Sequence, residues 1–138
     1  MNVVFWGMKD VAFLDIWSEI HILSGIAIGY LLLNLYKNSK FEKKKAIIIT
    51  ALVIAYGWEM LEYFLESGLF GKVIANWFYA VEFLPNRIFI DPAMFLVGSL
   101  IALKKPTLAI PATFITVAWL LLHIFIFPHA EYIQSLLI

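Results

Sequence analysis

Hydrophobic residues in this chain are grouped into long blocks that short polar segments separate. Two blocks, Ile16 to Tyr36 and Thr107 to Phe127, are almost free of charge, and a third runs from Ala46 to Leu65. At about 1.5 Å of rise per residue, a helix over each block is about 30 Å long, which matches the hydrocarbon thickness of a bilayer. These blocks predict three transmembrane helices.

A fourth block, Ile88 to Leu103, is interrupted by Asp91-Pro92. Aspartate is a favoured N-cap and proline is favoured at the first helical position, so one interpretation begins the helix here. Phe83 to Ile90 would then enter the membrane as non-helical chain. The alternative, given equal weight, is a proline-kinked helix that continues outward past Asp91.

Lysines are concentrated in two segments between the blocks, and they predict an orientation. By the positive-inside rule both segments face the cytoplasm. Four spans put both segments on one side of the membrane, which favours the fourth span and places both termini outside. The lysines are Lys37, Lys40, Lys43, Lys44 and Lys45 in the first segment, and Lys104 and Lys105 in the second.

The segment from Glu66 to Arg87 is then on the outer face, and it is not simply polar. Apolar residues at positions 70, 73, 74, 77, 78 and 81 have helical spacing. They predict an amphipathic helix that lies along, or re-enters, the outer leaflet. Met1 to Leu14 is expected to be an interfacial segment. The predicted fold is all-α: one membrane domain, residues 1–138, built as a four-helix bundle with an interfacial or re-entrant helix between spans two and three.

Composition supports a cell-membrane location and excludes several classes of function. The 138 residues are 63% hydrophobic and 14% charged, which is more apolar surface than a soluble globule of this size can bury. The formal charge is zero, so no basic face for nucleic acid is expected. The absence of cysteine excludes disulfides, thiolate metal sites and thiol catalysis. Membrane lipids are the expected partners, with other membrane subunits or a second copy of the chain as further candidates.

Ionisable residues inside the predicted spans are the best indication of function, because charges are costly in a bilayer. Glu62 and Glu59 lie about 5 and 9 Å below the outer end of their span, at about 1.5 Å per residue. Glu19 and His21 lie at similar depth in the first span, and Asp91 reaches the same level. The Gly25-x-x-x-Gly29 spacing allows a neighbouring helix to approach His21 closely. The predicted ligand-binding residues are His21, Glu59, Glu62, Asp91, Arg87 and Glu19.

A divalent metal is a candidate cofactor of this layer. His21 with Glu59, Glu62 and Asp91 would form an oxygen-rich ligand set with one imidazole, which suits zinc, manganese or iron. No HExxH or ExxH motif supports this set. The alternative is a buried carboxylate pair that shares a proton or pairs with Arg87. Arg87 itself is either a ligand for phosphate or carboxylate, or an interfacial arginine.

Several short motifs resemble those of the VanZ-like group of small polytopic membrane proteins, from about His21 to Gly98. They are His21-x-x-x-Gly25, Trp58-Glu59-Met60-Leu61-Glu62, Pro85-Asn86-Arg87, Asp91 and Gly98. Phe95 departs from the pattern, because a polar residue is expected about four positions after the aspartate. The resemblance implies a role in the cell envelope and no particular reaction.

The leading hypothesis is therefore an integral membrane protein with an acidic and histidine-containing pocket in the outer leaflet, which binds a lipid headgroup, a small amphiphile or a cation. Two alternatives remain open. One is an accessory subunit of a membrane complex, and the other is a metal-dependent intramembrane enzyme that acts on a lipid-linked substrate.

Overall fold

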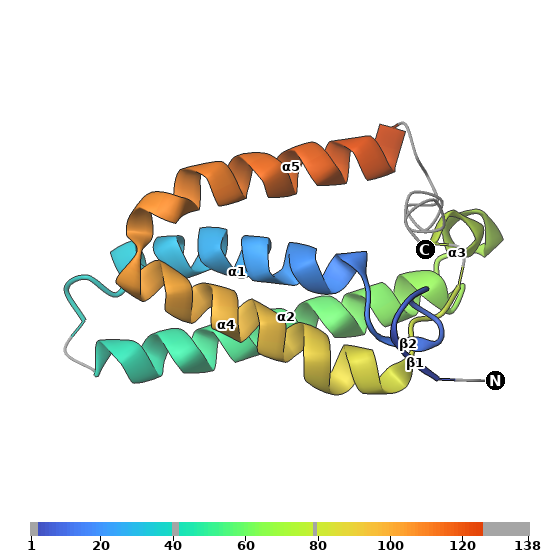
Figure 1. Ribbon diagram of the computed structural model, residues 1–138, viewed down its shortest axis with the longest axis horizontal. Helices are drawn as coiled ribbons and strands as arrows, with labels where there is room; N and C mark the ends of the chain where they lie inside the picture. The colour runs from blue at the N-terminus through green and yellow to red at the C-terminus, as the bar shows by residue number, and fades with distance from the viewer. Residues whose placement is uncertain (1–2, 40–41, 79, 126–138) are drawn as a thin grey trace.

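The computed structural model describes residues 3–39, 42–78 and 80–125, and these residues are mostly helical (Figure 1). Four helical segments are long and apolar enough to cross a membrane. They are α1 (Ile16–Leu35), α2 (Lys43–Glu66), the π-helical η1 (Asn86–Ile90) continuing as α4 (Asp91–Lys104), and the 3₁₀ turn η2 (Pro106–Leu108) continuing as α5 (Ala109–Phe125). Four such helices are characteristic of a multi-pass membrane protein.

Three of the predicted spans agree with the structure to within a few residues. The block from Ile16 to Tyr36 is α1, and the block from Ala46 to Leu65 is α2, which begins three residues earlier at Lys43. The last block corresponds to η2 and α5, and its predicted residues 126 and 127 lie outside the described residues.

The third span is longer than the interpretation in which its helix begins at Asp91-Pro92. Helix continues without a break from Asn86 to Lys104, so the non-helical entry of residues up to Ile90 is wrong for 86–90, and Asp91 does not cap a helix. Pro92 has no N–H and crowds the preceding turn, which leaves the Ile88 carbonyl without its usual backbone donor. The Tyr56 hydroxyl of α2 donates to that carbonyl at 3.1 Å. The π-helical turn and this bond let the helix pass Pro92.

Two short strands and a short helix lie near the ends of the spans, and the sequence predicted the helix but not the strands. The strands β1 (Val4–Trp6) and β2 (Ala12–Leu14) pair in parallel, so the all-α prediction was wrong for this interfacial segment. The short helix α3 (Lys72–Phe78) falls within the predicted amphipathic helix. Figure 1 shows the strands and α3 at the same end of the long helices. The Phe83 amide donates to the Lys9 carbonyl at 2.7 Å, which joins the N-terminal segment to the chain between α3 and η1.

Glycines bring the backbones of α1 and α4 into direct contact. A Cβ at Gly25 would collide with the Phe95 carbonyl, and one at Gly29 would lie 2.6 Å from the Ser99 Cα. The Ser99 hydroxyl donates to the Gly25 carbonyl across the same contact at 3.1 Å. The predicted close approach at the Gly25-x-x-x-Gly29 spacing is thus confirmed, and α4 is the neighbour. Figure 1 shows α1 between α2 and α5.

Gly98→Ala should destabilise the protein, whereas Gly57→Ala should not. A Cβ at Gly98 would collide with the Ile22 carbonyl and lie 2.9 Å from the Ile26 nitrogen, both backbone atoms of α1 that cannot rotate away. We expect a loss of about 1–3 kcal/mol in the free energy of unfolding. Gly57 is exposed on α2 with nothing within 4 Å, so alanine should stabilise that helix slightly. Thermal unfolding in detergent, followed by circular dichroism, measures both, and equal midpoints would contradict the backbone contact.

Candidate functional site

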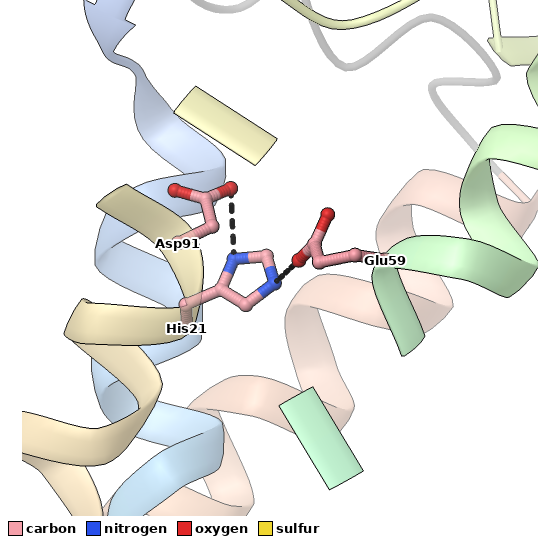
Figure 2. Close-up of side chains that lie close together, drawn as sticks. All are labelled: His21, Glu59 and Asp91. Atoms are coloured by element: carbon pink, nitrogen blue, oxygen red, sulfur yellow. Dashed lines mark ion pairs between the residues drawn. The ribbon is translucent and has the colours of Figure 1, made fainter. Parts of the chain in front are cut away.

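Three of the predicted ligand residues meet at one buried point, and each comes from a different long helix (Figure 2). His21 of α1 lies between the carboxylates of Glu59 from α2 and Asp91 from α4. Nε2 is 3.0 Å from Glu59 Oε1, and Nδ1 is 3.2 Å from Asp91 Oδ2. All three residues are buried, with at most 7% of their surface exposed. One potential ligand atom from each lies within 4.8 Å of the others.

The start of α1 fixes the orientation of the imidazole. His21 Nδ1 lies 2.8 Å from the Trp17 carbonyl one turn earlier, and a carbonyl can only accept, so Nδ1 carries a proton. Asp91 lies at the same edge of the ring, and its Oδ1 accepts from the Ser18 hydroxyl at 2.7 Å. Ser18 is itself part of a capping box with Asp15, the N-cap residue of α1. Nε2 is therefore the nitrogen presented to Glu59.

The carboxylate of Glu59 is buried without a hydrogen bond. Neither of its oxygens accepts one from any described residue, and Asp91 Oδ2 has none either. The 3.0 Å contact between Glu59 and His21 lacks the geometry of an N–H···O hydrogen bond, and Arg87 Nε is 3.8 Å from Glu59 Oε2. A buried carboxylate left in this state is costly unless a cation or proton balances it.

A second buried cluster lies beside the first, and each of its carboxylates is paired. Glu66 Oε1 is 2.8 Å from Lys9 Nζ, and Glu66 Oε2 is 2.6 Å from Arg87 Nη2. Glu82 accepts from Arg87 Nε at 3.1 Å and from the Asn86 amide at 3.0 Å. This cluster ties the N-terminal segment, the end of α2 and η1 together. Arg87, predicted as a ligand for phosphate or carboxylate, is held here by protein carboxylates.

Carboxyl groups outnumber cationic side chains across the two clusters. Six carboxyl groups gather there, but among the described residues only two side chains with permanent positive charge lie with them, Lys9 and Arg87. If His21 were also protonated, the six carboxyl groups would still outnumber the three cations by three. The carboxyl groups are those of Asp15, Glu59, Glu62, Glu66, Glu82 and Asp91.

Asp15 and Glu82 lie outside the spanning helices, and both have raised pKa values, as expected where carboxyl groups outnumber cations. Burial raises the pKa of Asp15 to about 6, and the charge of Asp91 adds to this, whereas the hydrogen bonds from the Ser18 and Trp17 amides oppose it. Burial and the nearby Asp91 carboxylate also raise the pKa of Glu82, against the opposing charge of Arg87. The region therefore favours any bound species that adds positive charge.

Two predicted site residues lie outside the three-residue cluster. Glu62 is half-buried beside Glu59 and has no hydrogen bond or ion pair to a described residue. Glu19 is exposed, because a helix turns by about 100° per residue and Ser18, not Glu19, shares the inward face with His21. The structure therefore does not bring Glu19 to the site.

Sequence reasoning missed several residues that support the site. Asp15 and Ser18 had a detectable signal, because an aspartate three residues before a polar side chain at a helix start is typical of a cap. Glu66 shares a helix face with Glu59 and Glu62. Glu82 could be inferred from the sequence as a partner of Arg87, which is five residues away, whereas Lys9 carried no signal, because a long-range contact with Glu66 brings it in.

Two cavities flank the cluster. One has a volume of about 220 Å³ and lies between α1, α2, α4 and α5, with His21 in its wall. The other, of about 280 Å³, lies between α2 and η1, and Glu59 and Arg87 line it. His123 of α5 is not in the cluster, because its ring packs on Trp17 and Trp77, at 4.7 and 4.6 Å between centroids. Two residues of the cluster, His21 and Glu59, thus line cavities on different sides.

Comparison with known proteins adds no family to this description. A scan against protein-family models and searches of curated proteins and of solved structures each return no match to the chain. The resemblance to the VanZ-like group therefore stays a prediction that rests on its short motifs.

Arg87→Met should destabilise the protein far more than Lys45→Met. Arg87 is a buried cation whose loss leaves Glu66 and Glu82 without a shared partner, so we expect a loss of about 3–5 kcal/mol. Lys45 pairs with Glu42 at 2.7 Å, but both side chains are more than 60% exposed, so its loss should cost less than about 1 kcal/mol. Thermal unfolding in the same detergent compares the two, and a similar cost for both would refute the buried network.

Proposed function

We propose that this chain is an integral membrane protein that binds a divalent metal ion between His21 Nε2 and the Glu59 carboxylate, with the Asp91 carboxylate 3.2 Å from Nδ1 at the other edge of the ring. The observation that carries the proposal is the 3.0 Å contact between these groups. The proton on Nδ1 is directed to the Trp17 carbonyl, so a neutral His21 presents a lone pair to a carboxylate. Two acceptors at this separation repel each other unless a cation lies with them.

The geometry suits a metal better than a second proton. The contact lacks the geometry of a hydrogen bond from a protonated Nε2, although a protonated imidazole would still form an ion pair with Glu59. Neighbouring ligands of an octahedral ion, each about 2.1 Å from the metal, lie about 3 Å apart, as these two atoms do. Asp91 stands at the opposite edge of the ring, where second-shell carboxylates of metal-bound histidines commonly lie. Imidazole and carboxylate together suit zinc, manganese or iron.

The membrane context forms part of the same proposal. The four spanning helices form a bundle in the cell membrane, with the lysine-rich loops in the cytoplasm, both termini outside, and α3 along the outer leaflet. This orientation rests on the positive-inside rule and places the metal site in the outer half of the membrane. The VanZ-like motifs support a role in the cell envelope. The accessory-subunit and intramembrane-enzyme hypotheses remain predictions, and bound metal would be a precondition for the enzyme.

Purified protein supplied with manganese or zinc should retain about one equivalent of metal after desalting. Glu59→Gln and His21→Gln should each lose it, because each removes a ligand. Asp91→Asn should weaken binding by about 10–100-fold, as expected for a second-shell partner. Elemental analysis measures the content, and Glu19→Gln is the matched control because Glu19 is exposed away from the site.

Each variant is first shown to be folded by its thermal transition, so that lost metal is not confused with lost structure. Wild-type protein without stoichiometric metal, even after supplementation, would refute the proposal. Retention of metal by the folded double variant His21→Gln/Glu59→Gln would refute it as well.

The orientation can be tested cleanly because the sequence contains no cysteine. Ser67→Cys after α2 should react with a membrane-impermeant maleimide in intact cells. Asn38→Cys, in the loop between α1 and α2, should react only after permeabilisation. Both native residues are exposed, so accessibility should reflect the side of the membrane. The reverse pattern would show that the lysine-rich loops face outward.

A further inference from the structure

We propose that the 220 Å³ cavity beside His21 holds one hydrocarbon chain of a membrane lipid and so places the lipid headgroup region at the metal site. This inference deepens the proposed function by naming the class of ligand that the site takes. The cavity wall is almost entirely apolar, with His21 as the residue it shares with the site. The apolar residues that define it include Trp17, Ile20, Ile28, Ile54, Trp58 and Phe95.

The cavity lies where lipid can enter from the side. Both α2 and α5 pack on α1, but they do not pack extensively on each other, and Figure 1 shows them on either side of α1. Ile54 and Trp58 of α2 line the cavity and are still 37% and 46% exposed. Within a bilayer, surface exposed at this position faces hydrocarbon and not water. A lipid chain is therefore the species available to fill the cavity.

The volume of the cavity suits part of one hydrocarbon chain of a lipid. Its volume is below the roughly 300–1,000 Å³ typical of pockets for drug-sized molecules, so a whole two-chain lipid does not fit. A single unbranched chain would lie between Trp17 and Trp58 and leave the rest of the lipid in the membrane.

One polar group in the wall has no hydrogen-bond partner among the described residues. Thr116 of α5 is 9% exposed, and its hydroxyl makes no hydrogen bond with any described residue. A helical threonine usually donates to the carbonyl one turn earlier, so this state is unusual. In contrast, the Ser24 hydroxyl in the same wall donates to the His21 carbonyl at 3.1 Å. The Thr116 hydroxyl is itself buried within the protein, so the surface that the cavity offers to a lipid chain is almost entirely apolar.

The charge of the site restricts the headgroup. Carboxyl groups outnumber the permanent cations around His21. A headgroup with a net negative charge would be repelled, whereas a zwitterionic or uncharged headgroup would not. The proposed ligand is therefore a lipid without net negative charge.

Photo-cross-linking tests this inference. The probe is phosphatidylethanolamine with a diazirine in one acyl chain, and adducts on the purified protein are mapped by mass spectrometry. We expect adducts concentrated on the residues of the cavity, and competition by unlabelled phosphatidylethanolamine. Ser24→Phe should fill the cavity and reduce these adducts about tenfold, which corresponds to about 1.4 kcal/mol. Leu31→Phe, on an exposed face of the same helix, should leave them unchanged.

Two further measurements keep the test decisive. Thr116→Val preserves the shape of the wall and should leave the labelling unchanged, because the Thr116 hydroxyl is not open to the cavity. Phosphatidylglycerol with the same labelled chain should label the cavity more weakly. Adducts spread evenly over the exposed faces of all four helices would overturn the inference, as would equal labelling of folded Ser24→Phe and Leu31→Phe. Equal labelling by the two lipids would overturn the headgroup assignment.

Metal analysis of the same samples separates this inference from the proposed function. Folded Ser24→Phe should keep its metal and lose the cavity adducts. Wild-type protein that shows cavity adducts but binds no metal would refute the metal site and leave the lipid cavity standing. Wild-type protein that binds metal but shows no cavity adducts would refute the lipid cavity and leave the metal site standing.

Discussion

The direct backbone contact between α1 and α4 sets the geometry on which the site depends. Gly25 and Gly29 on one helix, and Gly98 on the other, remove the side chains that would hold the two backbones apart. In a bilayer there is little hydrophobic force between helices, so close van der Waals packing of this kind is a main source of association. The contact brings His21 within 3.2 Å of Asp91, and α2 then adds Glu59 from the other side.

The two buried clusters differ in how their charges are balanced, and this difference separates structure from function. In the Lys9–Glu66–Arg87–Glu82 cluster, each carboxylate has a cation or an amide at hydrogen-bonding distance. This pairing holds the ends of the helices together. In the His21 cluster, the oxygens of Glu59 accept no hydrogen bond from the part of the chain that the structure describes, although they are equally buried. Satisfied buried networks specify structure, whereas an unsatisfied one is a better indication of a missing ligand.

The site also occupies a distinctive place relative to the membrane. It lies between two cavities with largely apolar walls, one beside α5 and one beside η1, so its polar atoms have apolar surroundings. A metal ion held there would be shielded from bulk water, which strengthens its attraction for oxygen ligands. The proposals of a metal ion and of a lipid chain thus concern adjoining parts of one site, polar at His21 and apolar beyond Trp17 and Trp58.

The sequence by itself determined the four apolar segments, because spanning a bilayer requires about 20 consecutive apolar residues whatever the neighbours are. It also singled out His21, Glu59 and Asp91, because charge inside such segments is costly. Only the tertiary structure decided that these three meet while Glu19 faces away, since that depends on helix rotation and on contacts between distant segments. The same holds for the helical turn before Asp91, which depends on Tyr56 of another helix, and for Lys9, whose pairing with Glu66 no local pattern encodes.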